Sequence, residues 1–359
     1  MFRFQLLPHV VEHAARRSIL FALLRLSAAS GLYPQCLRLD GVECDSTSVT
    51  SGQFGEVRTG RYQARQICIK IFILDQTSEV EALVGSFTRE ALIWNQLKHP
   101  NVLQFSGIYH LSDVYGRIGL VSPWMENGNL TEYLKAHPDV PRLPFVYDIV
   151  SGLQYLHQNQ VIHGDLKGLN ILISDAGFAC LADFGLSAVM DADVIRWASL
   201  KTGAQVGGTA RWMAPEIIDG AEIGLLRPSS ASDVYSLASV MIEVFTGEVP
   251  YHEIPQSVTV IAKIIRGIKP AKPKREKALE LTEGIWKIMQ KCWSDTPSDR
   301  PTVDQVLELL RKDAPLGVRV EPKHVLESAD DRGDDPLSES DLTFLMTAVS
   351  EVAGWPPRS

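Results

Sequence analysis

The most informative segment of this chain reads His163-Gly164-Asp165-Leu166-Lys167-Gly168-Leu169-Asn170, and Asp183-Phe184-Gly185 follows thirteen residues after Asn170. Asp165 can accept a proton from a hydroxyl group, and Lys167 can neutralise a phosphoryl group during its transfer. Asn170 and Asp183 offer the oxygen ligands that a hard cation such as Mg2+ prefers. A polar loop with a capping aspartate would contain the same residue types, so the neighbouring segments decide between the two interpretations.

Two segments upstream predict a phosphate site. Ser51-Gly52-Gln53-Phe54-Gly55-Glu56-Val57 places two glycines in a tight turn, where backbone N–H groups can approach phosphate oxygens. Lys70 lies fifteen residues after Gly55 in an apolar strand pattern, and Glu90 can pair with its ammonium. Taken singly, the glycines would form an ordinary hairpin turn and the lysine would be an exposed edge residue. Together with residues 163–185, these segments contain the parts that phosphoryl transfer needs.

The apolar pattern changes in character along the chain. Before Leu130 it alternates over short runs, which predict strands at 56–60, 67–72, 101–108 and 118–122. Between these strands, Phe87, Ala91, Trp94 and Leu97 recur at helical spacing and predict one long helix. After Leu130 the apolar spacing of three and four predicts helices at 130–156, 231–247, 256–267, 282–293 and 302–312. The predicted class is α+β, with a small strand-rich lobe before a larger helical lobe.

Charge is concentrated at the two ends of the sequence. The net charge is −8, with an excess of arginine in residues 1–39 and an excess of acids in residues 321–341. The near-neutral middle lacks the gathered Lys and Arg that a nucleic-acid surface needs, so we expect no nucleic-acid partner. The acidic, Pro- and Gly-containing stretch Glu321 to Asp341 has few large apolar residues and is expected to be disordered, with a short terminal helix after it.

Cysteine usage and apolar runs bear on the cellular setting. The five cysteines are scattered and show neither the close pairs of a zinc site nor a disulfide framework, which favours reduced thiols in the cytosol or nucleus. The longest apolar run, Ile19 to Leu24, is far too short to span a bilayer, so no transmembrane segment is expected. Residues 1–30 are interpreted as a short amphipathic helix, with a targeting peptide as the alternative.

With these motifs in this order, the chain resembles a protein kinase over residues 46–312. The resemblance implies the bilobal kinase fold, with an N-lobe at 46–122, a linker between the lobes at 123–129 and a C-lobe at 130–312. Residues 1–45 would then be an N-terminal helix and linker, and residues 313–359 an acidic tail. It also implies ATP and Mg2+ as cofactors and proteins with Ser or Thr hydroxyls as substrates.

The resemblance assigns a role to each candidate site residue. Lys70 would anchor the α- and β-phosphates with Glu90 as its partner, Asp165 would be the catalytic base, Lys167 would assist the γ-phosphate, and Asn170 and Asp183 would hold Mg2+. Gly52, Gln53, Phe54 and Gly55 would cover the phosphates, Val57, Cys68 and Leu172 would sandwich adenine, Ser122 would be the gatekeeper, and the backbone of Pro123 and Met125 would bind adenine. Further matches are structural: Glu216 with a buried Arg300, Asp233 beneath the catalytic loop, and a spine of Phe105, Trp94, His163 and Phe184.

The kind of kinase is indicated by a mixture of features. Lys167 and Gly208-Thr209 resemble serine/threonine kinases, whereas Trp212-Met213 resembles tyrosine kinases. This mixture points to the tyrosine-kinase-like group, with phrasing similar to kinases of mushroom-forming fungi. Tyrosine or dual specificity, and a pseudokinase scaffold without activity, are the alternatives.

Two residues depart from the family pattern. Thr50 occupies the place of the first glycine in the phosphate-covering loop, and its β-branched side chain predicts weaker nucleotide binding. Gly164 replaces the arginine that usually pairs with a phosphorylated activation segment. The sequence therefore predicts that activity depends less on phosphorylation of Ser199, Thr202 or Thr209.

Overall fold

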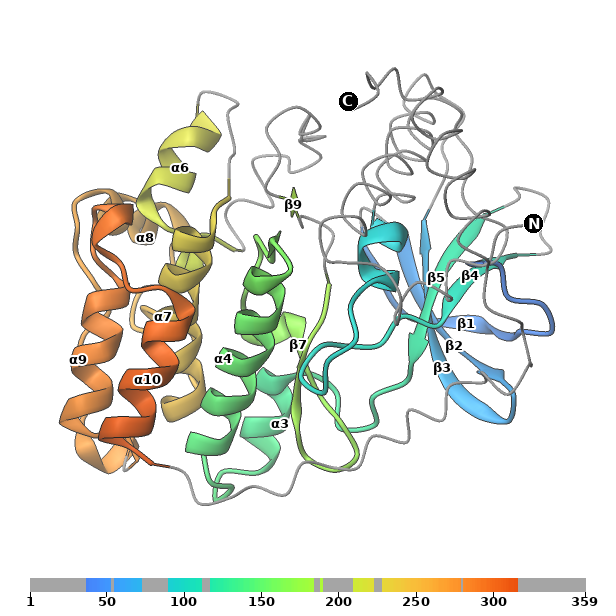
Figure 1. Ribbon diagram of the computed structural model, residues 1–359, viewed down its shortest axis with the longest axis horizontal. Helices are drawn as coiled ribbons and strands as arrows, with labels where there is room; N and C mark the ends of the chain where they lie inside the picture. Colours follow the sequence, from blue (N-terminus) through green and yellow to red (C-terminus); the bar gives the residue numbers. More distant parts are fainter. Residues whose placement is uncertain are drawn as a thin grey trace, which may run out of the picture. The chain divides into compact units, whose positions relative to one another are not determined.

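The structure is a computed structural model (Figure 1) that describes residues 37–52, 55–72, 90–111, 117–183, 188–189, 209–222, 228–278 and 280–315. These residues fall into two compact units. The first contains the described residues up to Lys98 together with Gln104–Trp124, and the second contains His99–Leu103 and the described residues from Met125 onward. The predicted N-terminal helix and acidic tail lie outside the described residues.

The first unit is built on an antiparallel sheet. Within the described residues its five strands have the order β1-β2-β3-β5-β4. Their bounds are Glu43–Gly52 for β1, Gly55–Tyr62 for β2, Arg65–Phe72 for β3, Gly107–His110 for β4 and Ile118–Pro123 for β5. Residues 90–95 are helical. The predicted strands at 56–60, 67–72 and 118–122 are therefore confirmed.

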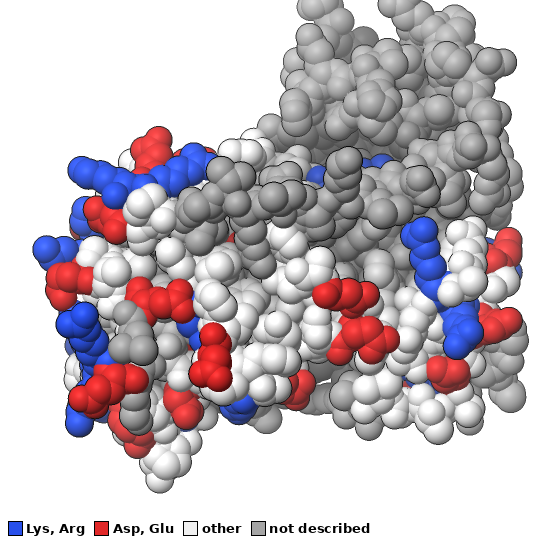
Figure 2. Space-filling view, turned by 90° about the horizontal axis from the view of Figure 1, so that it is seen from below, with Lys and Arg blue, Asp and Glu red and all other residues white. Residues whose placement is uncertain are grey.

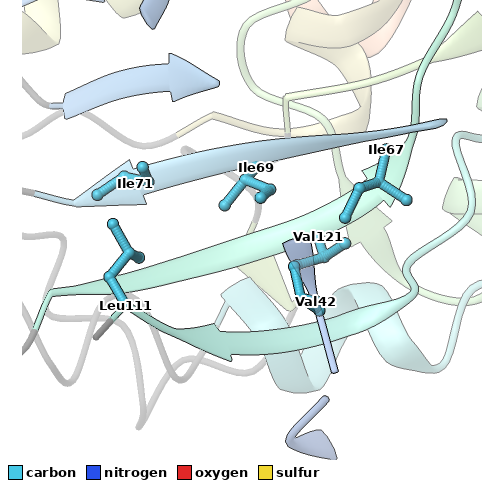
Figure 3. Close-up of a cluster of buried hydrophobic side chains, with 6 residues drawn as sticks. All are labelled: Val42, Ile67, Ile69, Ile71, Leu111 and Val121. Carbon is cyan, nitrogen blue, oxygen red and sulfur yellow. The ribbon is translucent and has the colours of Figure 1, made fainter. Parts of the chain in front are cut away.

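Alternation along β3 separates a core face from a less buried face. Ile67, Ile69 and Ile71 are buried together with Val42, Leu111 and Val121 (Figure 3). Successive strand side chains point to opposite faces of a sheet, so Cys68 and Lys70 project from the other side of β3. The apolar periodicity of this one strand thus presents Lys70 away from the core.

The strand predicted at 101–108 is wrong over residues 101–106. The strand β4 begins only at Gly107, and Val102 instead forms an isolated bridge with Leu181. The Leu103 N–H donates to the Leu181 carbonyl at 2.8 Å, and the Asn101 side chain donates to the Ala179 carbonyl at 3.0 Å. The Leu103 N–H and the Asn101 carbonyl therefore find their partner at Leu181, 78 and 80 residues further along the chain, where no local pattern could indicate it.

The second unit is mainly helical. Its helices are α3 (Leu130–Ala136), α4 (Leu143–Gln158), α6 (Pro215–Glu222), α7 (Ser230–Thr246), α8 (Ser257–Ile265), α9 (Glu283–Cys292) and α10 (Val303–Asp313). Two short antiparallel pairs join β6 (Val161–Ile162) to β9 (Ala188–Val189) and β7 (Ile171–Ile173) to β8 (Ala179–Leu181), and the second pair is a hairpin. The helices predicted at 231–247, 256–267, 282–293 and 302–312 are confirmed, as is the α+β class. The helix predicted over 130–156 is instead two helices, α3 and α4, separated by residues 137–142.

Helix α7 forms the centre of this unit. It begins at a capping box in which Ser229 and Ser232 bond each other's backbone N–H, and it ends at Gly247 in the left-handed conformation. Most of its residues are buried, including two acids, Asp233 and Glu243. It packs against α4 and α9, and α10 packs against both of those helices (Figure 1). A helix that is apolar nearly all round is a buried helix, so the acids within it need specific partners.

The surface carries charges of both signs. In Figure 2, Lys and Arg side chains are interspersed with Asp and Glu side chains over the coloured part of the face in view. Among the helices in the described ranges, none combines the length and apolar character needed to cross a membrane.

Candidate active site

An ion pair joins Lys70 of β3 to Glu90 of the helical residues 90–95 in the first unit. The Lys70 Nζ lies 3.3 Å from the Glu90 Oε1, which confirms the predicted pairing. The Glu90 side chain is 8% exposed, whereas that of Lys70 is 33% exposed. A buried acid that holds a partly exposed lysine suits a cation that binds an anionic ligand, because the acid fixes the position of the lysine without removing it from solvent.

The glycine-containing turn is a hairpin between β1 and β2. Its register pairs Thr50 with Val57 and Gly52 with Gly55. Val57 in turn lies opposite Lys70 on β3, so the turn of the hairpin begins next to the lysine. Gln53 and Phe54 at the tip, and the Thr50 side chain, lie outside the described residues.

Cys68 and Ser122 face each other across β3 and β5. Burial raises the pKa of the Cys68 thiol to about 11, although a hydrogen bond with Ser122 opposes that shift. The thiol is therefore protonated at neutral pH and behaves as a small apolar group, as a contact with a flat aromatic ligand would require. The residue after Pro123 is held by a backbone hydrogen bond, in which the Trp124 N–H donates to the Gln66 carbonyl at 3.2 Å. Pro123 ends β5.

In the second unit, residues 125–129 pack on the β7–β8 hairpin. The Gly128 N–H donates to the Met125 carbonyl at 3.0 Å, and the Gly128 carbonyl accepts from Ile173 N–H at 2.9 Å. The strand β7 carries Leu172, which bridges to Asn129 and lies opposite Cys180. Leu172 is partly buried.

Two side chains, those of Lys167 and Asn170, converge on Asp165. The Lys167 Nζ lies 2.8 Å from Asp165 Oδ2, and Asn170 Nδ2 donates to the same oxygen at 3.1 Å and to the Asp165 carbonyl at 2.8 Å. Lys167 also donates to the Thr209 hydroxyl at 3.2 Å. The residue types and the kinase resemblance predicted these roles, and the structure brings an acid, a cation and an amide within hydrogen-bond distance of one another.

Asp233 holds the beginning of this loop. Its Oδ2 accepts from His163 N–H and its Oδ1 from Gly164 N–H, each at 2.9 Å, and His157 Nε2 lies 2.9 Å from Oδ2. The predicted fastening role of Asp233 is confirmed. His163 is fully buried, and burial lowers the pKa of its imidazole, so the ring stays neutral beside the loop.

The two predicted Mg2+ ligands lie at one end of the β7–β8 hairpin. Ile171 pairs with Leu181, and Ala182 N–H donates to the Asn170 carbonyl at 2.9 Å, which places Asp183 one residue beyond that bond. Because Asn170 Nδ2 is committed to Asp165, its amide oxygen is turned toward the other side. Asp183 is exposed and has a φ of 60°, a left-handed conformation that is strained outside glycine. One carboxylate and one amide oxygen fit the ligand set of Mg2+, which takes its remaining ligands from water and phosphate.

A second acid of α7 was missed by sequence reasoning. Glu243 accepts from the Gly168 N–H at 2.9 Å, from the Trp212 Nε1–H at 2.6 Å and from the Thr131 hydroxyl at 3.2 Å. The sequence did contain a sign of its importance, since Glu243 is the one charged residue between Val234 and Thr246. A buried acid in so apolar a helix demands hydrogen-bond donors, but the sequence does not say which ones.

The segment after Thr209 is held by two arginines. Arg300 forms a two-pronged ion pair with Glu216, at 2.6 and 2.8 Å, which confirms that predicted contact. Arg211, which was not singled out from the sequence, donates to the carbonyls of Pro250 and Tyr251 at 2.9 and 2.8 Å and to that of Ile254 at 2.6 Å. Both guanidinium groups satisfy several acceptors at once through donors held in a planar fork, a geometry that a lysine ammonium does not offer.

Other predicted residues are placed only in part. Trp94 and Phe105 are in contact, with ring centroids 5.3 Å apart, whereas Phe184 lies outside the described residues. Ser199 and Thr202 lie outside them as well. Thr209 is buried and its hydroxyl is engaged by Lys167, so it is poorly suited to modification.

Comparison with known proteins agrees with this geometry. The family model for protein tyrosine and serine/threonine kinases matches residues 45–310. The chain therefore belongs to this family, and its strand-rich and helical units correspond to the two lobes of the bilobal protein kinase fold.

Individual relatives are similar over the same region. The chain is 31% identical to the serine/threonine-protein kinase STY17 of Arabidopsis thaliana over 268 residues, which are 74% of this chain and 43% of that protein. It is 30% identical over 260 residues to a probable serine/threonine-protein kinase of Dictyostelium discoideum, covering 72% of this chain and 48% of that protein. It is also 30% identical over 273 residues to the tyrosine-protein kinase csk-1 of Caenorhabditis elegans, covering 73% and 46%. The chain thus spans less than half the length of these relatives, and the resemblance to fungal kinases stays a prediction.

Proposed function

We propose that this chain transfers the γ-phosphoryl group of ATP to serine or threonine hydroxyls of protein substrates. The observation that carries the proposal is the placement of the Lys167 Nζ between the Asp165 carboxylate and the Thr209 hydroxyl, at 2.8 and 3.2 Å. The arrangement puts a base and a cation side by side. Lys167 is also the residue that favours serine/threonine over tyrosine substrates.

The chemistry follows from these residues. Asp165 accepts the proton of the attacking hydroxyl while the hydroxyl oxygen forms a bond to the γ-phosphorus. The bond between that phosphorus and the oxygen that bridges to ADP breaks, and ADP leaves. Lys167 stabilises the negative charge on the transferring group, and Lys70, held by Glu90, binds the non-transferred phosphates. Asn170 and Asp183 would hold Mg2+, which supplies charge neutralisation on the phosphate oxygens.

The experiment is phosphate transfer from ATP with Mg2+ to a serine/threonine peptide library and to a matched tyrosine library. Asp165→Asn and Lys70→Met are each expected to lower kcat by about a hundredfold or more, the scale of a lost general base or phosphate anchor. Two exposed residues provide matched controls, Asp175→Asn and Lys312→Met, which should retain wild-type rates.

Each result has a distinct meaning. Transfer to the serine/threonine library that both site variants abolish supports the proposal, whereas preference for the tyrosine library would refute its specificity. No transfer by the wild-type protein, with Mg-ATP either binding or failing to bind in a thermal-shift assay, would favour a scaffold without catalysis.

The proposal also covers the group of kinases to which the chain belongs, its dependence on phosphorylation and its cellular compartment. We place the chain in the tyrosine-kinase-like group because serine/threonine features at Lys167 and Thr209 occur beside Trp212, and because relatives of both specificities match it. With Gly164 in place of the usual arginine, Ser199→Ala and Thr202→Ala should each keep at least about a third of the wild-type kcat. We also propose a role in signalling. A reducing compartment, cytosol or nucleus, is supported by the free cysteines at 44, 68, 180 and 292.

A further inference from the structure

Glu243 connects three segments of the second unit through one carboxylate. The side chain is only 2% exposed, and its partners belong to the catalytic loop (Gly168), to the 3₁₀ turn that precedes Ala214-Pro215-Glu216 (Trp212) and to α3 (Thr131). We infer that Glu243 is a positioning residue for catalysis, which holds Gly168, and with it Lys167 and Asn170, in the place that phosphoryl transfer requires. The inference rests on the kinase activity proposed above.

Gly168 provides the space that this contact needs. A Cβ built at Gly168 would clash with Thr131 Oγ1 and would lie 2.7 Å from Glu243 Oε1. A real Cβ does not approach an oxygen so closely, so any other residue would force the carboxylate away from the loop. The hydrogen bond between the Gly168 N–H and Glu243 therefore requires both the buried acid and a residue without a Cβ at position 168.

The contact acts on the catalytic residues through the backbone. Gly168 begins the 3₁₀ turn Gly168–Asn170, in which Asn170 N–H donates to the Lys167 carbonyl at 2.9 Å. Restraining the Gly168 N–H thus restrains the residues on both sides of it. Asp233 holds the start of the loop at His163 and Gly164, and Glu243 holds its second half. A single helix, α7, supplies both acids, so the two ends of the loop share one rigid support.

Hydrogen-bond geometry, more than charge, carries this role. Burial raises the pKa of Glu243 to about 7, against the opposing effect of its three donors and of Lys135. A glutamine would keep one oxygen for Gly168 and Trp212 and would offer its amide group to the Thr131 hydroxyl. The neutral isostere should therefore preserve the positioning, whereas an alanine would leave the Gly168 and Trp212 N–H groups without their acceptor.

The test compares Glu243→Ala and Glu243→Gln by steady-state kinetics and by amide hydrogen exchange over residues 163–170. Ser239→Ala is the matched control, because Ser239 is a buried polar residue of the same helix whose hydroxyl accepts from Trp293 and not from the loop. In Glu243→Ala we expect kcat to fall about tenfold with the KM for ATP within about twofold, and Gly168 exchange to rise about tenfold, the size of effect that one buried hydrogen bond supplies. Glu243→Gln should stay within about threefold of the wild type in both quantities.

Three results would overturn the inference. The first is a Glu243→Ala protein whose kcat and Gly168 exchange match those of Ser239→Ala. The second is a Glu243→Gln protein as impaired as Glu243→Ala, which would assign the role to charge. The third applies if Glu243→Ala does not fold: Gly168→Ala then replaces it, and unchanged kcat and loop exchange in that variant would exclude positioning. Hydrogen exchange is read without catalysis, so an inactive wild type would refute the proposed function while the exchange still decides whether Glu243 holds the loop.

Discussion

At the scale of single residues, Gly164 allows a left-handed backbone conformation and replaces the arginine that the family usually has at this position. Its φ is 76°, and its N–H donates to Asp233 at 2.9 Å, so the left-handed conformation is fixed by a buried partner. A residue with a Cβ at this position would be strained, and glycine avoids that cost while also removing the arginine that the family usually has here.

The strain can be measured. Gly164→Ala should lower the free energy of unfolding by about 1 kcal/mol, and Gly164→Asn by roughly half as much, because asparagine tolerates the left-handed conformation. Urea unfolding of the two variants beside the wild type measures both values. Equal destabilisation by alanine and asparagine would contradict the explanation from φ.

Glu243 predicts a pH dependence of stability. Its pKa is raised from 4.5 to about 7 by burial, so between these values the folded chain keeps a proton that the unfolded chain has released. Stability therefore falls as pH rises from about 4.5 to about 7 and is level above that range. Relative to Glu243→Gln, the wild type should lose up to about 3 kcal/mol across this window.

The measurement is urea unfolding of wild type and Glu243→Gln at pH 5, 6, 7 and 8. Glu276→Gln is the control, since Glu276 is exposed and should leave the wild-type pH profile unchanged. Parallel profiles for wild type and Glu243→Gln would show that the acid titrates normally and would disprove the prediction.

At the scale of an element, the start of α4 depends on a distant acid. Arg142, the residue at its N-cap, makes no capping bond with its side chain. Instead Glu280 accepts from the Arg142 N–H at 2.7 Å and from the Leu143 N–H at 2.9 Å. A carboxylate at this end satisfies two unpaired donors and interacts favourably with the helix dipole.

Removing that carboxylate should weaken the helix. Glu280→Ala is expected to cost about 1–2 kcal/mol of unfolding free energy, the range of a lost N-cap. Glu276→Ala, a nearby exposed change, should stay within about 0.5 kcal/mol of wild type. Thermal and urea unfolding compare the two, and an equal effect from both variants would count against the capping role.

At the scale of the whole molecule, Arg300 joins separate helices of the second unit. Its guanidinium pairs with Glu216 of α6 and also donates to the carbonyls of Ala231 in α7 and of Ser294 after α9, at 3.0 and 2.8 Å. It lies 5.1 Å from the centre of the Tyr235 ring as well. The Arg300 side chain is 0% exposed, so each of its N–H donors has to find an acceptor within the protein.

Arg300→Lys should therefore be far from conservative. We expect a loss of about 2–4 kcal/mol in unfolding free energy, because an ammonium cannot reach both Glu216 oxygens and the two carbonyls together. Arg311→Lys on the exposed side of α10 is the control. If Arg300→Lys unfolds at the same urea concentration as Arg311→Lys, the network does not stabilise the unit.

The sequence by itself determined the α+β class, the positions of most elements and the main catalytic candidates. Strands such as β3 and helices such as α10 follow from periodicity within the element, because burial acts on side chains at fixed spacing. Lys70, Asp165, Lys167 and Asn170 were recognisable because their chemistry is concentrated in short, ordered motifs.

Only the tertiary structure decided which distant groups support those motifs. Glu243 meets Gly168 across 75 residues, and Glu280 caps α4 across 138 residues. Residues 101–103 likewise leave the predicted strand because their hydrogen-bond partners lie near Leu181. A buried polar group must find a partner, but the partner is set by how the chain packs, and no local pattern records it.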